Sequence, residues 1–169
     1  ICKAFHKLHV LRLCNANSKI YYQFWRAIFL AVLTIILFIL IKNKKIGVSI
    51  FSNLVIITAL NQLLKNILQR PRPTEYRIIE ETGYSFPSGH SMISMAFYGY
   101  IIYLIYKYVT NKYIKWISIV LLSILICSIG ISRIYLGVHY TSDVLGGFSI
   151  SISYLVIYIS AVNKFLIEK

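Results

Sequence analysis

Three short motifs hold side chains suited to binding and transferring a phosphoryl group. They are Lys65-x6-Arg72-Pro73, Pro87-Ser88-Gly89-His90 and Ser132-Arg133-x5-His139-x3-Asp143. Transfer of a phosphoryl group is accelerated mainly by positioning and by cations that counter the charge on its oxygens. The three motifs supply three cations, two histidines and a carboxylate. They predict a phosphoryl-transfer site if the chain brings them together.

The cations and one helix start are candidates for holding the phosphate. The planar guanidinium group matches two phosphate oxygens at once, so we expect Arg72 and Arg133 to fix its geometry. Lys65 is expected to act as a point charge. Ser88 and Gly89 precede an apolar run and are expected at the start of a helix, where backbone N–H groups and the helix dipole favour anions.

The two histidines are candidates for the chemical steps. If the residues from His139 onward are helical, His139 and Asp143 lie on one face, one turn apart. Asp143 can then accept a hydrogen bond from one ring nitrogen and leave the other to attack phosphorus. We expect His139 to be the nucleophile, and His90 to protonate the departing oxygen and later activate water. The sequence leaves the reverse assignment of the two histidines open.

No metal or other cofactor is expected. The cations already balance a phosphate, and a site for a hard cation needs several converging oxygens. Glu75, Glu80 and Glu81 lie in the long polar segment between two apolar runs. We expect these three carboxylates to face water.

Membrane helices must position these motifs. The chain of 169 residues is 58% hydrophobic and only 14% charged, whereas charged residues make up about a quarter of ordinary soluble domains. We predict an all-α integral membrane bundle with five transmembrane helices, because the sequence contains five apolar windows that are each long enough to cross a bilayer. The windows are 24–41, 46–64, 87–106, 116–136 and 144–162. Residues 24–169 would form the transmembrane domain, and residues 1–23 an interfacial helix or a tail.

The distribution of basic residues predicts the topology. The net charge is +13, but the basic residues lie between apolar runs and not along a soluble stripe, so nucleic acid is not an expected partner. Alternating the five spans puts eight lysines on one side, which the positive-inside tendency assigns to the cytoplasm. These are Lys42, Lys44, Lys45, Lys107, Lys112, Lys115, Lys164 and Lys169. The same alternation puts all three motifs on the opposite, extracytoplasmic side.

Over about residues 46–162 the chain resembles the type 2 phosphatidic acid phosphatase (PAP2) superfamily, which also includes vanadium haloperoxidases. The three motifs match the signature of that superfamily at every position. The resemblance implies a phosphohistidine at His139 supported by Asp143, with His90 as the acid and no metal. It implies that the phosphate is held by Lys65, Arg72, Ser88, Gly89 and Arg133. Bacterial members usually have six spans, so a sixth helix is expected upstream of residue 1 or replaced by the N-terminal segment.

These observations predict a phosphatase in a bacterial plasma or inner membrane that acts on lipid phosphates or diphosphates. The expected partners are the lipid substrate and the surrounding membrane lipids. Undecaprenyl diphosphate, phosphatidylglycerol phosphate, phosphatidic acid and lipid A phosphates are all candidates, because the motifs recognise only phosphate. Two alternatives use the same pocket. One is a vanadate-dependent haloperoxidase, against which the short apolar chain argues, and the other is an anion-binding transporter or inactive relative.

Overall fold

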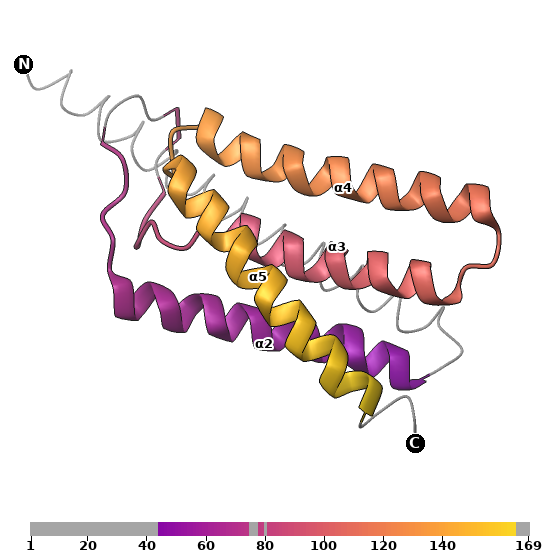
Figure 1. Cartoon of the computed structure of the whole chain (residues 1–169). Helices are drawn as coiled ribbons and strands as arrows, with labels where there is room; N and C mark the ends of the chain where they lie inside the picture. The colour runs from indigo at the N-terminus through magenta and orange to yellow at the C-terminus, as the bar shows by residue number, and fades with distance from the viewer. Residues whose placement is uncertain (1–43, 75–77, 80, 165–169) are drawn as a thin grey trace, which may run out of the picture. The chain divides into compact units, whose positions relative to one another are not determined.

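Four long helices make up most of the part of the chain that the structure describes. The structure is a computed structural model that describes residues 44–74, 78–79 and 81–164. The helices are α2 (Lys44–Leu68), α3 (Gly89–Tyr108), α4 (Lys112–Tyr135) and α5 (Thr141–Val162), as Figure 1 shows. The chain divides into two units, Ile1–Gly47 and Val48–Lys169. All three motifs lie in the second unit.

The predicted all-α class is confirmed, and four of the five predicted windows coincide with helices. Three helices are long and apolar enough to cross a membrane, namely α2, α4 and α5. The helix α3 is not among them because tyrosine, serine and histidine side chains interrupt its apolar residues. The window 24–41 and the segment 1–23 lie outside the described residues, so these two parts of the prediction stay untested.

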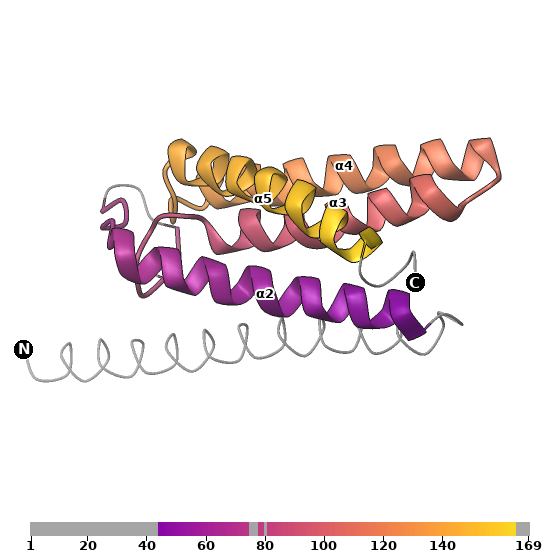
Figure 2. The same ribbon diagram turned by 60° about the horizontal axis from the view of Figure 1, so that its bottom comes forward.

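Helix α3 is the centre of the second unit. It packs against both α4 and α5, and it runs between α4 and the portion of α2 that follows Val48 (Figures 1 and 2). Ile57 of α2 meets Met92 and Ala96 of α3 in a cluster from which solvent is excluded. Leu60, Leu64, Ile93, Ile150 and Tyr154 pack around that cluster.

Hydrogen bonds across helices add to this packing. Tyr100 Oη donates to Ser49 Oγ at 2.8 Å, and Tyr158 Oη donates to the Ser49 carbonyl at 2.5 Å. Asn53 Nδ2 donates to the Ala96 carbonyl at 2.9 Å. Within a bilayer apolar surface gives little drive for helices to associate, so such bonds and close packing hold the helices together. They fix α2 against both α3 and α5.

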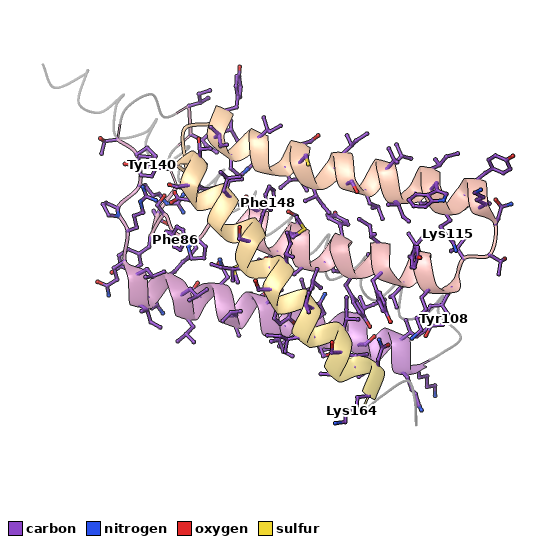
Figure 3. The ribbon with its side chains drawn as sticks, viewed as in Figure 1. Phe86, Tyr108, Lys115, Tyr140, Phe148 and Lys164 are labelled. Atoms are coloured by element: carbon purple, nitrogen blue, oxygen red, sulfur yellow. The ribbon has the colours of Figure 1, made fainter. Side chains whose placement is uncertain are left out.

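Glycines on the helices form notches that receive large side chains. A Cβ atom at Gly130 of α4 would lie 2.6 Å from Phe148 Cζ of α5, and one at Gly146 of α5 would lie 2.6 Å from Phe86 Cε2. Both phenylalanines are labelled in Figure 3. On α3, a Cβ at Gly99 would lie 2.8 Å from Leu155 Cδ1. Small residues of this kind let membrane helices approach closely.

Candidate active site

Two connections meet at one end of the second unit. One is the segment from Gln69 to Ser88 between α2 and α3, and the other is the turn between α4 and α5. Figure 3 shows Phe86 and Tyr140, one from each connection, at the same end of the helices. The three sequence motifs border these connections, which confirms that they gather at one end of the bundle.

The polar segment between α2 and α3 folds back on itself, so that Ser85 lies beside Arg70. Ser85 N donates to the Arg70 carbonyl at 2.8 Å, so the chain before Arg72 runs beside the chain before Phe86. Lys65, in the last turn of α2, donates from Nζ to the Tyr84 carbonyl at 2.9 Å. These bonds hold the polar segment against the helix ends.

Arg72 is buried and fixed by backbone carbonyls. Its side chain is 6% exposed. Nε donates to the Gly83 carbonyl at 3.0 Å, Nη2 to that of Thr82 at 3.2 Å and Nη1 to that of Val138 at 3.0 Å. Nη1 also lies 3.4 Å from His139 Nε2. These bonds hold the guanidinium group of Arg72 beside the imidazole ring of His139.

The expectation that Glu81 faces water is wrong. Its side chain is only 14% exposed; Oε2 accepts from Arg72 Nη1 at 3.0 Å, and Oε1 lies 3.8 Å from Arg133 Nη1. Burial alone raises the pKa of this carboxyl, but nearby positive charge, that of Arg72 foremost, holds it below its ordinary value. The other groups that lower it are His90, His139 and Arg133. One carboxylate thus lies among the groups predicted to bind phosphate. Glu75 and Glu80 lie outside the described residues.

The remaining predicted phosphate ligands lie at helix ends. Arg133 is buried in the last turn of α4, with Nε donating to Ser132 Oγ at 3.1 Å. Ser88 is the fully buried N-cap of α3, and Gly89 is the first residue of that helix. His90 follows in the first turn and is partly buried. The N-terminus of α3 therefore adds backbone donors to the cations.

A turn between α4 and α5 places His139. Gly137 has a φ of 68°, in the left-handed region that glycine adopts without strain at the end of a helix. Its N–H donates to the Ile134 carbonyl at 2.9 Å. The chain then reverses into α5, which begins at Thr141. His139 therefore lies before the helix, so the condition under which helical spacing would place His139 and Asp143 on one face is not met.

His139 and Asp143 nevertheless meet, because Asp143 turns back to the helix start. Asp143 Oδ2 accepts from Tyr140 N at 2.9 Å and lies 3.6 Å from His139 Nδ1. His139 is only 3% exposed. Burial lowers the pKa of its ring to about 4, helped by the positive charges of Arg72 and Lys65. Near neutral pH the ring is therefore uncharged, with Nε2 turned toward the arginine.

Two further side chains touch Asp143, and the sequence analysis missed both. Arg70 Nη1 donates to Asp143 Oδ1 at 2.7 Å and to Ser142 Oγ at 2.8 Å. Ser85 Oγ donates to Asp143 Oδ2 at 2.5 Å and lies 3.4 Å from His139 Nδ1. Arg70 carried a usable signal, since it precedes Arg72 by two positions across a proline, and residues two apart in an extended chain face the same side. No sequence signal marked Ser85.

No cluster of three metal-ligating side chains occurs within residues 44–74, 78–79 and 81–164. The two carboxylates of the site, Glu81 and Asp143, both contact arginines. The expectation of a metal-independent site stays a prediction.

Comparison with known proteins gives the family. A family model described as the PAP2 superfamily matches residues 45–167, which is well over half of the chain. The chain belongs to the PAP2 superfamily. Phosphatidylglycerophosphatase B of Bacillus subtilis (strain 168) is 41% identical over 95 residues, which are 55% of this chain and 46% of that protein.

Two other PAP2-like relatives have names that refer to diphosphates. The undecaprenyl-diphosphatase of Sulfolobus acidocaldarius is 30% identical over 120 residues, 68% of this chain and 54% of that protein. Dolichyldiphosphatase 1 of Dictyostelium discoideum is 31% identical over 130 residues, 75% of this chain and 55% of that protein. The chain spans about half the length of the curated relatives it matches.

A solved structure shares the PAP2 transmembrane fold. It is the crystal structure of the first transmembrane PAP2 type phosphatidylglycerolphosphate phosphatase from Bacillus subtilis. The two structures superpose with a TM-score of 0.72 at 32% sequence identity, over 81% of this chain and 70% of that one. This protein is accordingly an integral membrane protein with transmembrane helices.

Proposed function

We propose that this protein is a membrane phosphatase that hydrolyses a lipid phosphate or diphosphate through a phosphohistidine at His139. The observation that carries the proposal is the environment of that ring. Nδ1 faces Asp143 and Ser85, and Nε2 faces Arg72. The lowered pKa of the buried ring keeps it uncharged near neutral pH, as a nucleophile requires.

In the first step, Nε2 of His139 attacks phosphorus, and the bond between phosphorus and the lipid oxygen breaks. His90 protonates the departing oxygen as a general acid. In the second step, water attacks the phosphohistidine while His90 takes one of its protons. The bond between phosphorus and Nε2 then breaks, which returns the imidazole and releases inorganic phosphate. The other product is a lipid alcohol from a monoester or a lipid monophosphate from a diphosphate.

The phosphate would be held by Lys65, Arg72 and Arg133 together with Ser88 and Gly89 at the start of α3. Positioned cations and donors of this kind stabilise charge in the transition state. The placement of Glu81 between the two arginines supports this assignment, because it marks a position where an anion is favoured. The substrate phosphate would then compete with that carboxylate for the same guanidinium groups.

The membrane helices support a lipid as the substrate. Three helices are able to cross a bilayer, and the site lies at their ends, at the depth of lipid headgroups. The names of the relatives point to phosphatidylglycerophosphate and to undecaprenyl or dolichyl diphosphate as substrates of those proteins. We assign the same class to this chain, with phosphatidic acid and lipid A phosphates as further candidates. The lysines at the opposite end favour an extracytoplasmic site.

Phosphate release by the purified protein tests the proposal. The panel contains phosphatidylglycerophosphate, undecaprenyl diphosphate, phosphatidic acid and lipid A, each with EDTA present, and His139→Ala is the control. Release that persists in EDTA and is lost in His139→Ala is expected, and the ranking of lipids identifies the substrate. Absence of release from every lipid, with phosphate still bound, would instead indicate an anion-binding transporter or an inactive relative.

A further inference from the structure

The contact between His139 and Asp143 is too long for a direct hydrogen bond. Nδ1 and Oδ2 are 3.6 Å apart, which is beyond hydrogen-bonding distance, whereas the 3.4 Å between Nδ1 and Ser85 Oγ is at the long end of that range. The hydroxyl of Ser85 lies beside the two groups and contacts both. Its Oγ is 2.5 Å from Asp143 Oδ2 and 3.4 Å from His139 Nδ1. The serine is itself fully buried.

The hydroxyl can serve both neighbours in only one arrangement of protons. A serine hydroxyl has one proton to donate and lone pairs that accept. An ionised carboxylate only accepts, so the Ser85 proton goes to Asp143. The oxygen then accepts from His139, which requires the imidazole proton to be on Nδ1. This tautomer leaves the lone pair on Nε2, the nitrogen that faces Arg72.

Arg70 completes the arrangement from the other side of the carboxylate. Its Nη1 donates to Asp143 Oδ1 at 2.7 Å, and its guanidinium carbon lies 4.4 Å from the centre of the Tyr140 ring. Asp143 is 0% exposed, and a buried charge is costly unless it is paired and hydrogen-bonded. With Oδ1 bound by Arg70, Oδ2 is left for Ser85 and the Tyr140 N–H.

The backbone couples Arg70 to Ser85. The N–H of Ser85 donates to the Arg70 carbonyl at 2.8 Å. Both side chains therefore reach Asp143 from one paired piece of chain, and their separation is set by a main-chain bond. Arg72, two residues after Arg70, lies beside Nε2 of His139, the ring nitrogen that Ser85 does not contact.

We propose that Ser85 and Arg70 are positioning residues for the nucleophile. Ser85 links His139 to Asp143 and selects the tautomer with the proton on Nδ1, and Arg70 fixes the carboxylate that receives the serine proton. The inference rests on the proposed role of His139 as nucleophile. It adds two side chains that act through other residues and do not touch the phosphate.

Steady-state kinetics on the best lipid of the panel give the first test. Ser85→Ala should lower kcat by about 10- to 100-fold, because a misoriented nucleophile costs that much, while KM and inhibition by vanadate change by less than about threefold. Ser85→Thr, which keeps the hydroxyl, should recover much of kcat. Arg70→Met should also lower kcat, and Arg70→Lys less so. Ser153→Ala is the matched control, because Ser153 is exposed on α5 and its hydroxyl donates only to the Ser149 carbonyl of the same helix, and it should retain wild-type kcat.

The tautomer itself gives a test that does not need turnover. Nitrogen NMR of the ¹⁵N-histidine-labelled full chain at pH 7 reads the protonation of each ring, and His139→Ala assigns the signal among the four histidines. The wild type should show the Nδ1-protonated form of His139, and Ser85→Ala a mixture of tautomers. An unchanged tautomer together with unchanged kcat in Ser85→Ala would overturn the proposal.

The two readouts separate failure of this inference from failure of the proposed function. A wild-type protein that hydrolyses no lipid but shows the tautomer change in Ser85→Ala would refute the phosphatase assignment and support the positioning role. An active wild type with equally active Ser85→Ala and the same tautomer would do the reverse.

Discussion

The basic side chains at the two ends of the helical bundle have different partners. At the site end, Arg70 contacts Asp143, and Arg72 and Arg133 contact Glu81. At the other end, Lys107 Nζ lies 5.7 Å and 5.6 Å from the ring centres of Tyr103 and Tyr108, and Lys115 Nζ lies 5.4 Å from that of Tyr106. Figure 3 shows Tyr108, Lys115 and Lys164 gathered there. Both carboxylates of the described residues belong to the site end.

This difference separates a functional cluster from a topological one. Charges are costly at membrane depth and are accepted there mainly for function, whereas lysines and tyrosines at helix ends are typical of the membrane interface. At the site, Arg72 and Arg133 are buried and Arg70 is partly exposed, and all three contact carboxylates. At the other end, Lys107 is exposed and Lys115 is partly buried, and both lie along aromatic rings. Basic side chains alone do not mark a site, but their burial and their partners do.

Loss of the proposed nucleophile should have the largest effect on turnover, and it would sharpen this contrast between the two ends. His139→Ala should lower kcat by at least about 10⁴-fold, because it removes the nitrogen proposed to form the covalent intermediate. Brief reaction with a ³²P-labelled lipid should yield an acid-labile, base-stable phosphoprotein in the wild type and none in the variant. Labelling that survives in His139→Ala would place the intermediate on another residue, with His90 the first to examine.

Arg72→Lys comes next. It keeps the positive charge but loses the planar fork and its three bonds to carbonyls, so kcat/KM should fall by about 10²- to 10³-fold. The matched control is Lys107→Arg at the opposite end, which makes the reverse exchange and should have no effect. An active Arg72→Lys would show that charge without geometry is sufficient at the site.

The pH dependence of the ring of His139 should differ sharply from that of an ordinary histidine. With its pKa lowered to about 4, the ring stays neutral as the pH falls and gains a proton only near pH 4. At pH 5 about 90% of it should be neutral, against about 3% for an unperturbed ring of pKa about 6.5. NMR titration of the wild type measures this. Titration near 6.5 would mean that burial and Arg72 do not control the ring.

Glu81→Gln should have a smaller effect, and it should strengthen the binding of anions at the site. It removes a negative charge from between Arg72 and Arg133, while three carbonyls still hold Arg72 in place. Vanadate should therefore inhibit the variant at a concentration about three- to tenfold lower, as expected from loss of one partly screened charge interaction. Weaker inhibition would show that Glu81 organises the arginines more than it competes with the phosphate.

The smallest effect is expected at the lysine end. Lys107→Ala and Lys115→Ala should leave kcat and KM within about twofold of wild type, because charges so far from the site are screened. Protease accessibility in oriented vesicles reads the topology of the same variants. A large loss of turnover in either one would break the division between the two ends.

The sequence was sufficient for the helices and for much of the site. The window 46–64 corresponds to α2 (Lys44–Leu68), and the windows 116–136 and 144–162 correspond to α4 and α5 within a few residues. Membrane-spanning helices can be predicted from long apolar runs because the thickness of the bilayer sets the length of those runs. The motifs were predicted to share one end of the bundle, and they do. The catalytic and binding roles of their residues stay predictions.

Contacts made by the loops could not be predicted. Glu81, Ser85 and Arg70 lie in a polar segment without periodicity, and their partners are set by how that segment folds back against the helix ends. Ser85 reaches a carboxylate 58 positions further along the chain. Helical spacing also gave the wrong reason for the meeting of His139 and Asp143, since the chain reverses before α5 begins and the carboxylate caps that start.

The glycine notches have a consequence for the tolerance of this protein to mutation. Gly146 receives Phe86, which immediately precedes the Pro87-Ser88 entry to α3, and Gly147 brings α5 so close that an added Cβ would lie 3.2 Å from the Ser88 carbonyl. An alanine at Gly147 would require the backbone at Ser88 to shift by a few tenths of an ångström, and an alanine at Gly146 would displace the ring of Phe86. In a survey of all single substitutions, these two positions would affect turnover although neither glycine does any chemistry of its own.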